Sequence, residues 1–203
     1  MKTKPTFWYE KTLTQQGYSH IVGVDEAGCG ALAGPVVAGA VILPTDSRLG
    51  DLNDSKMLQE TLREDLYEKL TSMCDYWAVG SASAEEIGKI GIRPATYLAM
   101  RRAIEQIEKA DYALVDAWTI PGITIAQQGI IRGDSQVKSI AAASILAKVT
   151  RDRLMKQYAE KYPEYGFELH KGYGTSAHRK AIRKHGACKI HRTTFKTFQQ
   201  TLL

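Results

Sequence analysis

The stretch IVGVDEAGCG, residues 21–30, decides the fold and points to the site. Its first four residues are apolar, and turn residues follow, which predicts a short buried strand over Ile21–Val24. Because successive side chains of a regular strand face opposite sides of the sheet, Asp25 and Glu26 can serve one site only where the strand ends. The glycines beyond them allow a sharp turn and a close approach by a ligand. Two acids beside backbone N–H groups suit a divalent cation and a phosphate, but a solvated acidic turn explains this segment alone equally well.

Beyond this stretch, β-rich segments alternate with helix-like ones. We expect strands at Val36–Leu43, Tyr76–Ser81, Tyr112–Asp116 and within Ile123–Ile130, and helices from near Gln59, over Pro94–Lys109 and over Ser139 to about Lys161. Small residues at 141–144 would let the last helix lie close to a sheet. The pattern favours an α/β fold with a mixed sheet. We expect a lead-in over residues 1–20, a catalytic domain over 21–162 and a basic helical extension over 163–203.

Composition favours a globular protein of the reducing cytoplasm. The 203 residues are 44% hydrophobic and 24% charged, which fits one domain with an appendage. We expect no signal peptide, because no apolar run follows the first residues, and no membrane span, because the longest apolar stretch, 31–43, is too short. The three cysteines are widely spaced, which argues against a disulfide framework and for a cytoplasmic location.

The net charge of +5 has its source in the C-terminal region. From His170 to Leu203 the chain carries eight Lys or Arg residues and no acid, whereas the remainder has 19 basic and 22 acidic residues. Tyr173 and four histidines lie among these cations. Such a patch favours nucleic acid as a partner, and the alternative is a solvated helix face.

Four acids are candidate metal ligands. Asp25, Glu26 and Asp116 fall at the ends of predicted strands, where sites form in open α/β sheets. If those strands are parallel neighbours, the acids meet. Asp134 precedes the long helix, so interaction with the helix dipole is its alternative role. Clustered carboxylates raise one another's pKa, and Mg²⁺ supplies the missing counter-charge. An acidic centre beside a basic groove is typical of a nuclease with two metal ions about 4 Å apart.

From about Ile21 to Phe195 the chain resembles bacterial ribonuclease HII, the type 2 ribonuclease H. The resemblance rests on motifs in order: VDEAG at 24–28, LAGPVV at 32–37, LNDSK at 52–56, GD at 133–134, IAAASILAKVTRD at 140–152, HKGYGT at 170–175 and IHR at 190–192. It implies a ribonuclease H-like fold with a mixed five-stranded sheet flanked by helices and a C-terminal helical extension. It further implies a Mg²⁺- or Mn²⁺-dependent endoribonuclease, and since nothing in the sequence suggests a higher oligomer, we expect a monomer. Such an enzyme cuts the RNA strand of RNA–DNA duplexes, including 5′ of single ribonucleotides embedded in DNA.

The resemblance also assigns roles to residues. The metal-binding and catalytic acids are Asp25, Glu26, Asp116 and Asp134. The family's Gly-Arg-Gly motif, whose backbone amides address the ribose 2′-OH, is Gly28-Cys29-Gly30 here and lacks the arginine. Tyr173 matches the tyrosine that packs on the sugar at the RNA–DNA junction. The expected phosphate contacts are Lys56, Lys148 and Arg151.

Two departures from the family pattern leave alternatives open. Cys29 either fills the place of the arginine as a small residue or serves as a reactive thiol. The family usually has Asp-Gly at the third acid, whereas this chain has Asp116-Ala117-Trp118. Ala117 costs backbone freedom, and Trp118 either stacks on nucleic acid or packs against the protein.

Competing hypotheses involve other protein classes. A non-catalytic nucleic-acid-binding protein would use only the basic region and leave the four acids unexplained. A type 3 ribonuclease H would carry an extra N-terminal domain, and only about 20 residues precede Ile21. The early glycines have the wrong spacing for a dinucleotide-binding protein. His185-x-x-Cys188-x-x-His191 suggests a zinc site, although it lacks a second cysteine. The apolar tail residues 195, 198 and 202 dock a terminal helix or bind a sliding clamp.

Overall fold

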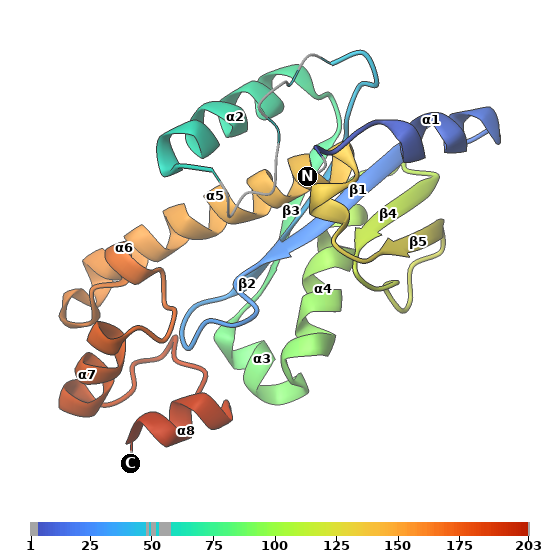
Figure 1. The fold of residues 1–203 in the computed structure, drawn as a ribbon. Helices are drawn as coiled ribbons and strands as arrows, with labels where there is room; N and C mark the ends of the chain where they lie inside the picture. The colour runs from blue at the N-terminus through green and yellow to red at the C-terminus, as the bar shows by residue number, and fades with distance from the viewer. Residues whose placement is uncertain (1–3, 48, 50–51, 53–57, 203) are drawn as a thin grey trace.

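The computed structural model describes residues 4–47, 49, 52 and 58–202 (Figure 1). Within these residues one mixed sheet has the strand order β3-β2-β1-β4-β5. Its strands are β1 (Ile21–Ala27), β2 (Val36–Ile42), β3 (Trp77–Ala82), β4 (Tyr112–Asp116) and β5 (Ala126–Ile130). Strands β1, β2 and β3 pair antiparallel, whereas β1, β4 and β5 pair parallel. Strand β1 therefore lies where the antiparallel and parallel parts of the sheet meet.

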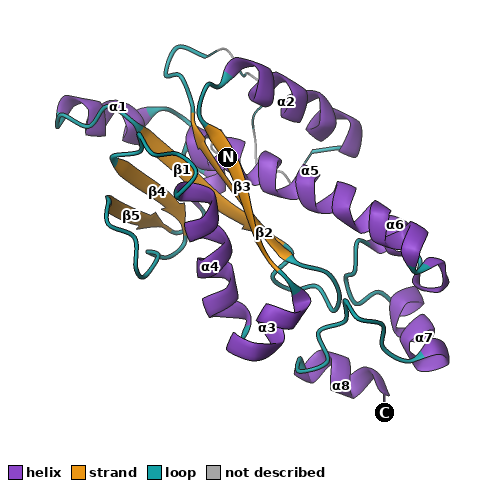
Figure 2. Ribbon diagram, turned by 180° about the vertical axis from the view of Figure 1, so that it is seen from behind, coloured by secondary structure: helices purple, strands orange, loops and turns teal. Residues whose placement is uncertain are grey.

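Helices cover both faces of the sheet (Figure 2). They are α1 (Trp8–Gln15), α2 (Glu60–Met73), α3 (Ala84–Ile90), α4 (Ile92–Ile104), α5 (Lys138–Lys161), α6 (Phe167–His170), α7 (Ser176–His185) and α8 (Lys196–Leu202), with short 3-10 turns η2 (Gly133–Ser135) and η3 (Pro163–Tyr165). Helix α4 packs on one face of the sheet, and α5 packs on the other together with α2. Helices α6, α7 and α8 gather beyond the C-terminal end of α5.

Small residues let the long helix α5 lie close to the sheet, as the sequence predicts. Residues 141–143, all alanine, are fully buried. A Cβ atom added to Gly39 of β2 would lie only 2.4 Å from the carbonyl oxygen of Ala143. The backbone of α5 therefore packs directly on β2, which fixes the position of every α5 side chain relative to the sheet.

The region after α5 shares a hydrophobic cluster with the loop between β1 and β2. Leu32 and Ala33 of that loop pack with Met155 of α5, Phe167 of α6 and Phe198 of α8. Phe198 is 1% exposed, so the docked terminal helix is the arrangement that the structure has. The division into a lead-in, a catalytic domain and an extension stays a prediction.

The five predicted strands, the three predicted helices and the parallel pairing of β1 with β4 are confirmed. One detail was wrong: Asp25 and Glu26 lie inside β1, because its antiparallel pairing with β2 continues to Ala27. Helices α1 and α3 were not predicted, although α3 begins with a capping box formed by Ser83 and Glu86. Among the described residues, no helix is both long enough and apolar enough to cross a membrane.

Candidate active site

Three carboxylates meet where the parallel pairing of β1 with β4 ends. The last paired residues are Val24 and Val115, so the next residues along the two strands are Asp25 and Asp116. The Oδ1 atom of Asp116 accepts a hydrogen bond of 2.7 Å from the N–H group of Gly133. This bond holds η2, and with it the buried Asp134, beside the strand ends. The sequence predicted that Asp25 and Asp116 meet at the ends of parallel neighbouring strands and that Asp134 joins them from the loop before the long helix.

The pKa of Asp25 is affected by the charges of the other three predicted acids. Asp25 is 4% exposed, and its pKa is raised well above the ordinary value by burial and by the charges of Glu26, Asp116 and Asp134. In the described part of the chain, no three His, Cys, Asp or Glu side chains are already grouped as a metal cage. The donor set nevertheless fits a hard divalent cation, because oxygen ligands suit Mg²⁺ and a bound cation would favour the ionised acids.

A cavity of about 540 Å³ adjoins these acids, and we call it the Tyr173 cavity. Its lining is Glu26, Ala27, Gly28, Cys29, Gly30, Arg63, Lys148 and Tyr173. The structure therefore brings five of the predicted substrate-binding residues together beside one of the predicted metal ligands. It also adds Arg63 of α2, which the sequence did not single out because it is one of several charged residues on an amphipathic helix. Lys56 lies outside the described residues.

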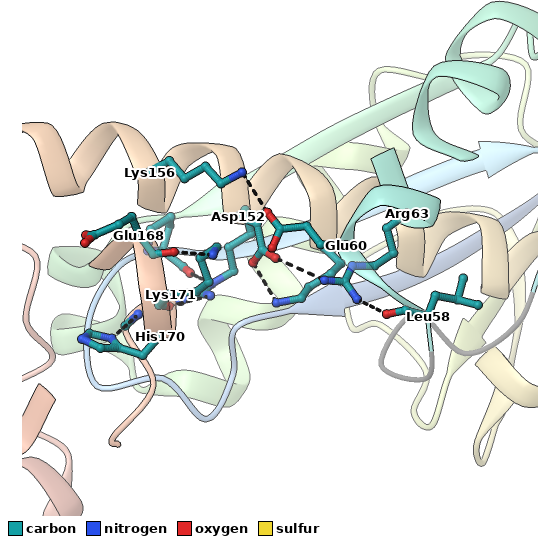
Figure 3. Close-up of polar contacts among 12 residues, drawn as sticks. Leu58, Glu60, Arg63, Asp152, Lys156, Glu168, His170 and Lys171 are labelled. Atoms are coloured by element: carbon teal, nitrogen blue, oxygen red, sulfur yellow. Dashed lines mark hydrogen bonds and ion pairs between the residues drawn. The ribbon is translucent and has the colours of Figure 1, made fainter. Parts of the chain in front are cut away.

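The cationic wall of the Tyr173 cavity is held by one shared carboxylate. Asp152 of α5 lies 2.7 Å from the Nζ atom of Lys148 and 3.9 Å from the guanidinium of Arg63. Figure 3 shows Arg63 and Asp152 in a larger network, in which Lys156 and Glu60 also link α5 to α2. Burial lowers the pKa of Lys148. Lys148 and Arg63 thus both line this wall, and their side chains suit a phosphate.

Arg151 does not have the predicted role. Its side chain is fully buried and donates three hydrogen bonds, to the carbonyl oxygens of Pro35 (3.0 Å), Lys171 (3.0 Å) and Ala33 (3.2 Å). The predicted phosphate contact of Arg151 is therefore wrong. This face of α5 packs against the loop after β1 and the C-terminal region, and helical spacing alone did not reveal that. The guanidinium instead joins the two segments that carry the glycine motif and Tyr173.

A second buried arginine supports the same loop. Arg192 is 1% exposed and donates to the carbonyl oxygens of Gly34 and Cys29, each at 2.9 Å. Gly28 has φ +95°, and an added Cβ would lie 1.9 Å from Nε of Arg151, so only glycine fits there. The loop between β1 and β2 is thus held from behind through its carbonyl groups. The sequence resemblance included Arg192 in a motif but gave it no role.

Cys29 has the environment of a small, neutral filler. Its Sγ atom lies 3.2 Å from Oγ1 of Thr96 and 3.5 Å from Oε1 of Glu26. Burial, and then the charge of Glu26, raise the pKa of the thiol to about 12. The thiol is therefore protonated at neutral pH, which argues against a reactive thiolate.

The position of Tyr173 is fixed by a chain of hydrogen bonds between histidines. The N–H group of Cys188 donates to Nδ1 of His191 (2.9 Å), so neutral His191 carries its proton on Nε2, 3.1 Å from Nε2 of His178. The Nδ1–H group of His178 then donates to the carbonyl oxygen of Tyr173 (3.0 Å). Burial lowers the pKa of both histidines to about 4, so both are neutral at pH 7. Both ring nitrogens of His191 are engaged in this chain, and among the described residues no three His, Cys, Asp or Glu side chains are grouped to hold a metal ion, so the structure gives no support to the zinc hypothesis.

The Tyr173 ring itself faces the cavity. The side chain is 37% exposed, and the ring centroid lies 5.3 Å from Cζ of Arg151 and 5.8 Å from Nζ of Lys148. At these distances the cation–π attraction favours one orientation of the Tyr173 ring. The ring therefore offers a fixed apolar surface beside the Gly28–Gly30 loop.

Comparisons with known proteins agree with this geometry. Residues 22–198 match the family model for ribonuclease HII. The chain is 52% identical over 188 residues to ribonuclease HII of Clostridioides difficile (strain 630), covering 92% of this chain and 74% of that protein. It is 48% identical over 196 residues to ribonuclease HII of Syntrophotalea carbinolica, covering 96% and 94%. The structure of the PCNA:RNase HII complex from Archaeoglobus fulgidus is similar, with a TM-score of 0.72, 25% identity and coverage of 90% of this chain and 97% of that one. The chain thus belongs to the ribonuclease HII family and is a metal-dependent endoribonuclease of RNA–DNA hybrids.

Proposed function

We propose that this enzyme cuts on the 5′ side of single ribonucleotides embedded in DNA, and cuts longer RNA–DNA hybrids as well. The observation that carries the proposal is the grouping of Asp25 with three acids whose charges raise its pKa, one of which, Glu26, lines the Tyr173 cavity. Asp25, Glu26, Asp116 and Asp134 would hold two Mg²⁺ or Mn²⁺ ions. When bound, such ions activate a water molecule and stabilise the leaving oxygen of an in-line displacement. The products would carry 3′-hydroxyl and 5′-phosphate ends.

Recognition of the ribonucleotide is assigned to the Gly28–Gly30 loop. Because buried guanidinium groups hold the carbonyls of Cys29, Ala33 and Gly34, the loop keeps one conformation when substrate binds. A fixed loop can present its N–H groups to the 2′-OH without an entropic cost on binding. Gly30 is exposed, and no atom lies within 4 Å of the Cβ position there, which leaves room for a ribose.

Discrimination between RNA and DNA on the 3′ side is assigned to Tyr173. Its ring would pack on the sugar of the deoxynucleotide that follows the ribonucleotide. Lys148 and Arg63 would contact phosphates from the same cavity, and Lys56 stays a proposed phosphate contact on sequence grounds. The basic C-terminal region would contact the duplex farther away, so affinity should fall steeply with salt.

A cleavage assay tests the proposal. A labelled DNA duplex with one ribonucleotide, an all-DNA duplex and a long RNA–DNA hybrid are each incubated with Mg²⁺, Mn²⁺ or EDTA. We expect a metal-dependent cut 5′ of the ribonucleotide and no cut in all-DNA. Asp25→Asn should abolish cleavage while duplex binding persists. Cleavage of the long hybrid alone would contradict junction recognition. Binding without cleavage under any metal would favour the non-catalytic nucleic-acid-binding protein.

We propose that the enzyme is a monomer that works in the cytoplasm. A sliding clamp is a candidate protein partner. The support is the Archaeoglobus complex with PCNA. In this chain Phe198 of α8 is buried, so clamp binding through the tail would require α8 to leave its site. Pull-down of a clamp by the full chain, lost on deletion of residues 194–203, would support the partnership. An unchanged pull-down would contradict a role for the tail.

A further inference from the structure

A second cavity, of about 240 Å³, adjoins the acids, and we call it the Trp118 cavity. It shares Glu26 and Cys29 with the Tyr173 cavity. Its other walls come from α4, from Asp116 and from the segment that follows β4, none of which lines the Tyr173 cavity. The two cavities therefore extend from Glu26 in different directions.

An exposed aromatic ring forms one wall of the Trp118 cavity. Trp118 is 62% exposed, so its indole contributes little to the hydrophobic core. Its backbone is fixed directly after the acid: the N–H group of Trp118 donates to the carbonyl oxygen of Asp116 at 2.8 Å. The N–H group of Ala117 likewise donates to that of Ile130 at 2.9 Å. The structure thus holds an indole beside a metal-binding acid without using it for packing.

A cation faces this ring. Arg93, on the first turn of α4, is exposed and has its Cζ atom 5.7 Å from the centroid of Trp118. Among the described residues that line this cavity, Arg93 carries the only positive charge. Cys29 is neutral, so position 29 supplies no cation here. A flat ring beside a guanidinium suits a sugar together with its phosphate, since the ring packs on the sugar and the guanidinium binds phosphate oxygens.

We propose that the Trp118 cavity receives the nucleotide on the 5′ side of the scissile phosphate in the cleaved strand. This inference rests on the proposed function, in which the ribonucleotide and the deoxynucleotide that follows it occupy the Tyr173 cavity. A strand that leaves that cavity toward its 5′ end passes Glu26 and Asp116 and enters the Trp118 cavity. There the indole packs on the sugar of the 5′ nucleotide, and Arg93 contacts the phosphate on its 5′ side.

The test pairs each variant with a substrate that lacks the proposed contact. For Trp118→Ala, the 5′ nucleotide is replaced by a propanediol spacer, which keeps the phosphodiesters but has no sugar or base. For Arg93→Ala, the phosphate on the 5′ side of that nucleotide is a neutral methylphosphonate. Trp8→Ala is the matched control, because Trp8 is 63% exposed on the distant helix α1. The measurement is kcat/KM on intact and modified duplexes that each contain one ribonucleotide.

We expect each variant to lose about 10-fold on the intact duplex, the scale of one aromatic contact to a nucleotide for Trp118 and of one hydrogen bond to a charged group for Arg93. On the duplex that lacks its partner group, each variant should match the unmodified enzyme within error, and Trp8→Ala should match it on both duplexes. Equal losses for Trp118→Ala on the intact and spacer duplexes would overturn the subsite, as would no loss on the intact one. Failure of the unmodified protein to cut any ribonucleotide-containing duplex would overturn the proposed function and the subsite together.

Discussion

The two cavities that meet at Glu26 and Cys29 are built in different ways. The Tyr173 cavity presents backbone of residues 28–30, and the loop that carries them is held from behind by two buried arginines. Arg192 binds the carbonyls of Cys29 and Gly34, and Arg151 binds those of Ala33 and Pro35. The Trp118 cavity presents two exposed side chains, Arg93 of α4 and Trp118 after β4. Recognition by backbone therefore depends on buried residues far away in the sequence, whereas recognition by exposed side chains depends on few others. Substitutions behind the first cavity should change stability, and substitutions of the exposed Arg93 and Trp118 side chains in the second should change only binding.

At pH 7, the largest effect is expected for Arg151→Met. The substitution removes the donors for the carbonyls of Ala33, Pro35 and Lys171, and each buried carbonyl left unpaired costs about 1 kcal/mol or more. We expect the free energy of unfolding to fall by about 3 kcal/mol, measured by denaturant titration at pH 7. Arg93→Met is the matched control, and because Arg93 is exposed its effect should stay within about 0.5 kcal/mol. Similar losses in both variants would contradict the difference between the two cavities.

The next largest effect is expected for substitutions of Gly28 and Gly30, which should differ in what they change. Gly30→Ala meets no atom within 4 Å and should fold normally, yet its methyl group would occupy the space that we assign to the ribose. We expect a loss of about 2 kcal/mol in transition-state binding, roughly 30-fold in kcat/KM, on a duplex with one ribonucleotide. Gly28→Ala should instead lower thermal stability, because its Cβ would collide with Arg151. Normal kinetics for a folded Gly30→Ala variant would remove the loop from recognition of the 2′-OH.

Much of the sheet and of the acidic centre could be predicted, because short stretches of the sequence are enough to indicate the strands and the acids that follow them. The apolar run before Asp25 and the strand that ends at Asp116 follow from short-range patterns, and parallel neighbours bring strand ends together. The role of Arg151 could not be predicted, because helical periodicity does not say which elements pack against a given helix face. Arg63 and Arg93 were missed for a related reason. Each resembles the solvated charges around it until the fold places it in a cavity wall.

A pH effect should come from the histidines behind Tyr173. His178 and His191 are neutral in the folded protein down to about pH 4, whereas the unfolded chain takes up protons below about pH 6.5. Stability should therefore be unaffected by this pair above that pH. It should fall as the pH drops from about 6.5 to about 4, by up to about 1.4 kcal/mol per pH unit for each histidine. The ring of His170 stacks on that of His178 with centroids 4.4 Å apart, so a positive charge on one ring also disfavours protonation of the other.

Denaturant titrations at pH 7 and pH 5 measure this slope. His178→Asn should lose part of it, even where the variant is less stable at pH 7, because the substituted side chain no longer titrates. His185→Asn is the control, since His185 is exposed and should leave the slope unchanged. The same slope in all three proteins would show that other groups, and not the buried pair, cause the acid sensitivity.

The smallest effect concerns the one strained position beneath the Trp118 cavity. Ala117 has φ +61°, a left-handed conformation that costs an L-residue about 1 kcal/mol and that glycine adopts freely. Part of this gain is lost to the greater freedom of glycine in the unfolded chain, so Ala117→Gly should stabilise the protein by about 0.5 kcal/mol. Ala187→Gly, at an exposed loop alanine without positive φ, should destabilise it by a similar amount. Calorimetry of both variants measures whether each substitution raises or lowers the stability of the protein. A destabilisation in both would mean that contacts around Ala117 outweigh its strain, so that the Trp118 wall depends on its surroundings as the Tyr173 cavity does.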